Sequence, residues 1–172
     1  MTAYVAFVRG VNVGGNKMLS SAALKEACES LGFADVKTHL NSGNVVFRAK
    51  KADAKKIENA IALNARVILR TAAELRAAIA ANPFPDEAQT DPSHLLIQFL
   101  SGPLDAKAKA LLAAYSGTEK LHCGEREVYV HYTSMADSKL NLLLTEKKIG
   151  VAATGRNWNT VNALLRLLEE RE

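Results

Sequence analysis

The sequence has 172 residues, of which 48% are hydrophobic and 23% charged, with a formal net charge of +4; this composition excludes collagen-like, mucin-like and disordered chains and predicts a soluble globular protein. The longest apolar runs, such as Leu95–Leu100, fall far short of the ~18 residues of a membrane span, and Met1–Gly10 lacks a signal-peptide pattern. Two cysteines cannot make a disulfide framework, a CxxC pair or a four-ligand zinc site. We therefore expect a cytoplasmic location, no membrane association and no metal site.

The first half of the chain is expected to place its elements in the order βαββαβ, with one further helix. Thr71 and Glu74 form a T-x-x-E capping box that opens this last helix. The expected elements are a strand at Tyr4–Val8, a helix from Ser20 or Ser21 to Leu31, a hairpin with arms Val36–Leu40 and Val45–Arg48, a helix from Asp53 to Ile61, a strand at Arg66–Arg70 and a helix from Thr71 that stops before Pro83.

Three prolines and three acidic residues in Asn82–Pro92 fit neither a helix interior nor a central strand, so this segment is interpreted as a linker. The second half is expected to repeat the order strand, helix, hairpin and helix. Its expected elements are a strand at His94–Leu100, a helix from Asp105 to Tyr115, a hairpin with arms Lys120–Cys123 and Glu127–Tyr132, a helix from Asp137 or Ser138 through Leu144, and a last helix after Thr154 or Gly155 that carries an apolar stripe to Leu168.

These patterns predict an α+β fold of two ferredoxin-like βαββα subdomains with additional helices and an internal duplication. The N-terminal basic subdomain is expected at residues 1–82, the linker at 83–92 and the C-terminal subdomain with its closing helix at 93–172. Up to Asn82 the chain has 12 Lys and Arg against 6 Asp and Glu, and after it 10 against 12. The basic excess therefore lies in the first half, where it is compatible with an anionic partner. The alternative, which the composition favours, is that the excess has no binding role, because a pI near 9.1 is also common among proteins that bind no anion.

Two polar, glycine-containing loops are expected to meet at one edge of the first sheet. A right-handed crossover makes the first two strands parallel, so the loop Arg9–Lys17 and the turn Asn41–Asn44 leave the sheet together, about 10 Å apart at the usual strand spacing. The first loop follows a strand and precedes a helix, as phosphate-cradling loops do, but it has neither the Walker nor the G-x-G-x-x-G spacing. The alternative is that its glycines only turn the chain.

A third polar cluster, Arg156–Thr160, is expected at the start of the last helix, where the helix N-terminus attracts anions. Arg156 would supply a bidentate donor, whereas the asparagines are also explained as helix caps and Trp158 as a packing residue. The candidate ligand-binding residues share placement on these three loops and are Arg9, Asn12, Gly14, Gly15, Lys17, Ser42, Asn44, Arg156, Asn157 and Asn159. No catalytic residue, metal ligand or cofactor is identified.

Four ordered motifs, RGVNVGGNK, THLNSGNVVF, SKL followed by EKKIG, and RNWNTV, give the chain a family likeness. With them the sequence resembles an uncharacterised bacterial family, the domain of unknown function numbered sixteen ninety-seven, from Ala3 to about Leu168. The resemblance implies a compact α+β protein of two similar subdomains, with no established activity, substrate or cofactor. The family's glycine-containing turn ahead of SKL is replaced here by Thr133–Asp137, to which we assign no binding role.

The leading hypothesis is that the protein binds a small polar or anionic ligand, such as a phosphorylated metabolite, in a cleft formed by the three polar loops. One alternative is a nucleic-acid-binding module, for which only weak electrostatic binding is expected because Phe7 and Phe47 lack an RNA-stacking context. The other is a transferase or hydrolase acting on a phosphorylated metabolite, with Arg9, Lys17 and Arg156 supplying charge. Enzymatic activity and oligomeric state are left open.

Overall fold

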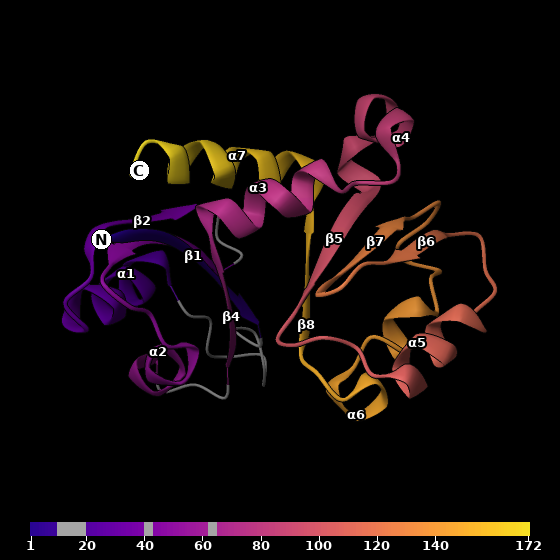
Figure 1. The fold of residues 1–172 in the computed structure, drawn as a ribbon, viewed down its shortest axis with the longest axis horizontal. Coiled ribbons are helices and arrows are strands. Elements are labelled where there is room, and N and C mark those ends of the chain that lie inside the picture. Colours follow the sequence, from indigo (N-terminus) through magenta and orange to yellow (C-terminus); the bar gives the residue numbers. More distant parts are fainter. Residues whose placement is uncertain (10–19, 40–42, 62–64) are drawn as a thin grey trace. The chain divides into compact units, whose positions relative to one another are not determined.

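The computed structural model describes residues 1–9, 20–39, 43–61 and 65–172. These residues form two compact units, Met1–Ala77 with Ala163–Glu172, and Ala78–Asn162. Each unit contains one four-stranded antiparallel sheet with helices, which makes the protein a mixed α+β fold (Figure 1). The domain boundaries expected from the sequence, at residues 82/83 and 92/93, stay a prediction.

The sheet of the first unit has the strand order β2-β3-β1-β4. Helices α1 and α2 pack on one of its faces, where Val8, Phe47 and Val67 contact Leu24 and Ile57 (Figure 1). The elements are β1 (Thr2–Arg9), α1 (Ser21–Ser30), β2 (Ala34–His39), β3 (Asn44–Ala49), α2 (Ala54–Ile61) and β4 (Arg66–Thr71), together with the first part of α3 (Ala72–Ala80) and the last part of α7 (Trp158–Glu169).

Capping residues define the helix starts of the first unit as the sequence predicts. The Ser20 hydroxyl accepts from the Ala23 amide at 3.0 Å, and the Asp53 carboxylate accepts from the Lys55 amide at 2.8 Å. Thr71 and Glu74 complete the reciprocal capping box, with the Thr71 amide donating to Glu74 Oε2 at 2.8 Å. Local sequence therefore determines where these helices begin.

The sheet of the second unit has the strand order β6-β7-β5-β8, which corresponds position by position to the order in the first unit. One face is covered by α5 and α6, whose residues Leu112 and Ile149 join Leu96, Val130 and Tyr132 in one apolar cluster. The elements are α4 (Pro85–Thr90), η1 (Pro92–His94), β5 (Leu95–Leu100), α5 (Ala106–Ala113), β6 (Lys120–Cys123), β7 (Glu127–His131), η2 (Leu140–Leu142), α6 (Glu146–Ile149) and β8 (Ala153–Asn157).

Three elements of the second unit differ from the sequence prediction. The segment interpreted as a linker contains the helix α4, because Pro85 occupies the first turn, where its missing amide costs no hydrogen bond. The helix expected from Asp137 or Ser138 is only a 3-10 turn, with the short α6 after it. The last helix does not follow Thr154 or Gly155 but begins at Trp158, because Ala153–Asn157 pairs with the buried strand β5.

Candidate functional site

The end of β1 and the β2–β3 turn meet at one edge of the sheet in the first unit. Both β1 and β2 pair antiparallel with β3, so the two strands run parallel, as predicted. The Val8 amide donates to the Gly43 carbonyl at 2.8 Å. A Cβ on Gly43, whose φ is +80°, would lie 2.7 Å from the Val8 carbonyl oxygen, so this position requires glycine. The turn lies closer to β1 than the spacing of about 10 Å suggested, because it leads directly into β3, the neighbour of β1.

Two arginines lie opposite each other at this edge. Arg9, the last residue of β1, is the cross-strand partner of Arg66, the first residue of β4. Glu58 of α2 contacts Arg66 Nε at 3.4 Å and accepts from the Val67 amide at 2.8 Å, with only 10% of its side chain exposed. The sheet therefore places two guanidinium groups at directly opposite strand positions of this edge.

Asn44 is the other predicted binding residue of this edge that the structure describes. Asn44 is buried and its amide nitrogen donates to the His39 carbonyl at 3.1 Å, which braces the turn from within. The remaining predicted residues of the two loops fall outside the described residues, and they are Asn12, Gly14, Gly15, Lys17 and Ser42.

Arg156 lies on β8 in the second unit. Its Nη1 donates to the Thr154 hydroxyl at 2.7 Å and to the Gly155 carbonyl at 2.8 Å. Burial lowers the pKa of Arg156 to about 10, which leaves the guanidinium charged at neutral pH. Arg9 belongs to the first unit and Arg156 to the second, so the cleft expected to join them stays a prediction.

The two asparagines beside Arg156 have different environments. The Asn157 side chain accepts from the Thr160 amide at 2.9 Å, which caps the first turn of α7. Trp158 is half-buried, and Asn159 is exposed. Arg156 thus precedes the helix by two residues instead of lying in its first turn, because β8 extends to Asn157.

A chain of polar contacts that begins at two buried side chains of the second unit was not predicted from the sequence. Gln98 of β5 is 8% exposed and donates to the Tyr132 hydroxyl at 3.5 Å, and Tyr132 donates to Asn141 Oδ1 at 3.0 Å. Burial raises the pKa of Tyr132 to about 12, so the phenol stays a donor at neutral pH. The available signal was a single amide residue inside the otherwise apolar strand Leu95–Leu100. Buried polar side chains of this kind are kept only where partners satisfy them.

Ser138, the first residue of the SKL motif, belongs to a second polar cluster in the same unit. The Ser138 hydroxyl accepts from the Leu140 amide at 3.2 Å, and Tyr115 donates to Glu119 Oε2 at 2.8 Å. Hydrogen bonds from Ser138 and then from Tyr115 lower the pKa of Glu119. These contacts give Ser138 a structural role, because its hydroxyl stabilises the turn at Leu140–Leu142.

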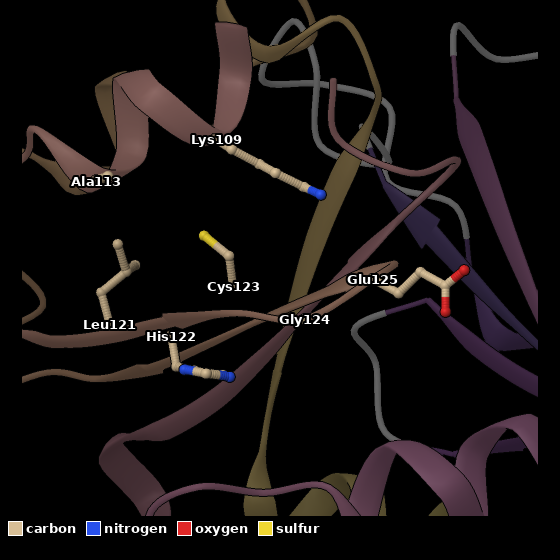
Figure 2. A pocket seen from close by; sticks show the side chains of 7 residues that line it. All are labelled: Lys109, Ala113, Leu121, His122, Cys123, Gly124 and Glu125. Atoms are coloured by element: carbon tan, nitrogen blue, oxygen red, sulfur yellow. The ribbon is translucent and has the colours of Figure 1, made fainter. Parts of the chain in front are cut away.

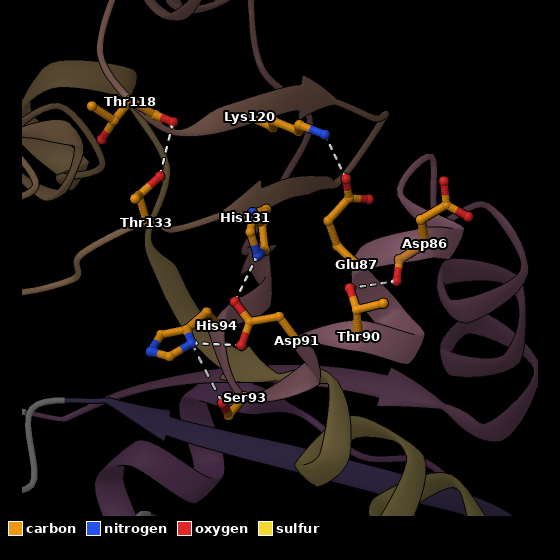
Figure 3. A network of polar contacts seen from close by, with 10 residues as sticks. All are labelled: Asp86, Glu87, Thr90, Asp91, Ser93, His94, Thr118, Lys120, His131 and Thr133. Atoms are coloured by element: carbon orange, nitrogen blue, oxygen red, sulfur yellow. Dashed lines mark hydrogen bonds and ion pairs between the residues drawn. The ribbon is translucent and has the colours of Figure 1, made fainter.

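Figure 3 shows an acid–base network around Asp91 in the second unit. One carboxylate oxygen contacts His94 Nδ1 at 2.7 Å and the other contacts His131 Nε2 at 3.0 Å. These hydrogen bonds, with that of His94 the larger, lower the pKa of Asp91. Beside them, the Lys120 ammonium contacts Glu87 at 2.5 Å and lowers the pKa of that carboxyl. The network fastens α4 and η1 to the β6–β7 hairpin.

Within the described ranges, no group of three or more His, Cys, Asp or Glu side chains is placed to hold a metal ion. Over the same part of the chain, no helix combines the length and the apolarity that a membrane span requires.

Comparisons with known proteins identify a family but no activity. A family model described as "Protein of unknown function (DUF1697)" matches residues 1–129. Among solved structures, a conserved bacterial protein, SP0830 from Streptococcus pneumoniae, is 24% identical with a TM-score of 0.77, over 98% of this chain and 99% of that chain. This similarity supports the fold. No curated protein matches the sequence.

Proposed function

The chain belongs to the DUF1697 family of proteins of unknown function. From its own residues we propose that it binds a small anionic ligand at the edge of the first sheet formed by the end of β1, the start of β4 and the β2–β3 turn, which we call the β1–β3 edge. The observation that carries this proposal is the cross-strand pair of Arg9 and Arg66 beside a turn held against β1 by the Val8–Gly43 hydrogen bond. Two guanidinium groups offer paired donors to a carboxylate or a phosphate. Lys17 and Asn12 of the adjoining loop are proposed as further contacts on sequence grounds alone.

A phosphorylated metabolite is the ligand class that we favour. Arg9 and Arg66 attract an anionic ligand such as a phosphate, whereas a neutral polar ligand gains no charge attraction from them. Glu58 already neutralises part of the charge of Arg66, so the site would discriminate against highly charged polyanions such as nucleic acids.

The test is a melting-shift screen with inorganic phosphate, pyrophosphate and sugar phosphates. We expect one or more of them to raise the melting temperature of the wild-type protein, and Arg9→Gln and Arg66→Gln to lose most of that shift. Arg76→Gln is the matched control, because Arg76 is an ion-paired arginine of the same unit that lies on α3 and contacts Glu169 and Glu172. Equal shifts in all four proteins, or no shift with any phosphate, would refute the proposal.

The two sheets have the same strand order, which is compatible with an internal duplication. We propose that the two units are ferredoxin-like repeats that arose by duplication, which is supported by the matching orders β2-β3-β1-β4 and β6-β7-β5-β8. Superposition of the two sheets with their helices is the test, and unrelated helix placements would argue against duplication. A cytoplasmic location is proposed because Cys28 and Cys123 are both free thiols.

A further inference from the structure

A groove in the second unit lies between α5 and the β6–β7 hairpin and has a volume of about 620 Å³ (Figure 2). This volume falls within the range of about 300 to 1,000 Å³ typical of small-molecule sites. The groove involves none of the residues of the proposed anion site. Its lining residues are Lys109, Ala113, Leu121, His122, Cys123, Gly124 and Glu125.

Strand alternation separates the apolar part of the groove from its polar rim. Leu121 and Cys123 point toward α5, whereas His122 points to the opposite side of the hairpin (Figure 2). Leu121 and Cys123 also pack against the apolar cluster of this unit. Glu125, at the hairpin tip, projects away from the thiol. The surface that a ligand would contact is therefore apolar on the hairpin side.

One cation borders this apolar surface. Lys109 lies one helical turn before Ala113 on α5 and lines the groove with Cys123. Burial raises the pKa of the Cys123 thiol, and the positive charge of Lys109 opposes part of this rise. Among the described residues, Lys109 has neither an ion pair nor a side-chain hydrogen bond, whereas Lys120 of the same unit is paired with Glu87. A single ammonium group beside an apolar wall matches a ligand with one negative charge and a hydrocarbon body.

We propose that this groove binds a small carboxylate with a short apolar chain, with the carboxylate paired to Lys109 and the chain lying on Ala113, Leu121 and Cys123. A monoanion fits better than a phosphate dianion, because only one ammonium faces the groove and the Glu125 carboxylate stands at its rim. The site is independent of the β1–β3 edge, so it can exist whether or not that edge binds anions.

Alkylation of Cys123 by iodoacetamide provides a direct readout of occupancy. The other thiol, Cys28, is 0% exposed, and burial raises its pKa to about 12, so modification of the native protein reports on Cys123. A bound ligand slows alkylation by a factor of 1 + [L]/Kd, which is about eleven-fold at a concentration of about ten times Kd. Because this factor is a ratio within each variant, any effect of a substitution on the intrinsic reactivity of the thiol cancels.

Hexanoate and its neutral analogue hexanamide are the two probes. We expect hexanoate at ~10 mM to slow alkylation about ten-fold, given a Kd of ~1 mM for a fragment of this size, and hexanamide to slow it much less. Lys109→Met keeps the apolar stem and removes the charge, so the two probes should then protect equally. Lys107→Met is the matched control, because Lys107 is an exposed lysine of the same helix outside the groove lining.

The proposal is overturned if hexanoate gives no protection, if hexanamide or inorganic phosphate protects the wild-type protein as well as hexanoate does, or if Lys109→Met keeps the full preference for hexanoate. Retained protection in Arg9→Gln would show that the groove acts separately from the anion site of the first unit. Loss of protection in Arg9→Gln would overturn the independence of the two sites.

Discussion

Replacing Gly43 with alanine tests the contact that holds the β2–β3 turn against β1. Gly43 has a φ of +80°, and a Cβ there would lie 2.7 Å from the backbone oxygen of Val8. Gly32 provides a matched control, because its φ is +83° but a Cβ there would meet nothing within 4 Å. The two substitutions therefore share the cost of left-handed backbone and differ in the clash.

The magnitudes follow from these two geometries. Gly32→Ala should lower the free energy of unfolding by about 1 to 2 kcal/mol, the cost of left-handed backbone for an L-residue. Gly43→Ala should cost about 1 to 3 kcal/mol more, because a backbone oxygen cannot move away as a flexible side chain can. Its displacement also weakens the Val8–Gly43 hydrogen bond of 2.8 Å, worth about 1 kcal/mol.

Urea unfolding followed by far-ultraviolet circular dichroism measures both variants. With an unchanged m-value, the shift in midpoint converts directly to the difference in stability. Equal destabilisation of the two variants would refute the reasoning, since it would mean that the turn does not lie against β1. The same result would remove the structural basis for placing Arg9 beside this turn.

Three further predictions concern the second unit and the thiols. Gly155→Ala should destabilise the protein by about 0.5 to 1.5 kcal/mol, because its Cβ would lie 2.6 Å from Gln98 Nε2 and push this side chain out of its rotamer. Adding Gln98→Ala should recover part of that loss, and strict additivity in the double-mutant cycle would contradict the packing. The lowered pKa of Asp91 means that its hydrogen bonds to His94 and His131 stabilise the fold above the unfolded-state pKa, near 3.8, and that this contribution is lost as pH falls through the lower folded-state value. Asp91→Asn should therefore flatten the acid limb of the stability profile below about pH 4, and an acid limb as steep as that of the wild-type protein would contradict this reasoning. A thiol titration with Ellman's reagent should modify Cys123 alone in the native protein and both cysteines in guanidinium, and rapid modification of Cys28 before unfolding would contradict its burial.

Local signals predicted most of the first unit. The capping residues Ser20, Asp53 and Thr71 accept or exchange the hydrogen bonds expected of them. The hairpin of β2 and β3 turns at Gly43, where the sequence places a turn. These features depend on neighbours within a few residues, which is why the linear pattern is sufficient.

Long-range strand pairing explains why the predicted start of the last helix was wrong. Ala153–Asn157 has the start signals of a helix, with Thr154 and Gly155 as candidate caps, yet it forms a strand. All six residues of β5 are buried, and its backbone needs partners on both sides. β7 supplies one side and β8 the other. The need for a second partner is a property of the sheet and has no local signature.

The sequence by itself determined the family, the α+β class, the helix starts of the first unit and the polar motifs, because each depends on residue identity and short spacing. Only the tertiary structure decided that Arg9 lies opposite Arg66, since strand register is set by the packing of a whole sheet. It also decided that Gln98 joins a chain of polar contacts with Tyr132, and that Lys109 and the β6–β7 hairpin border one groove. Those placements join residues distant in sequence, and the free energy that holds them comes from burial, which no short segment achieves alone.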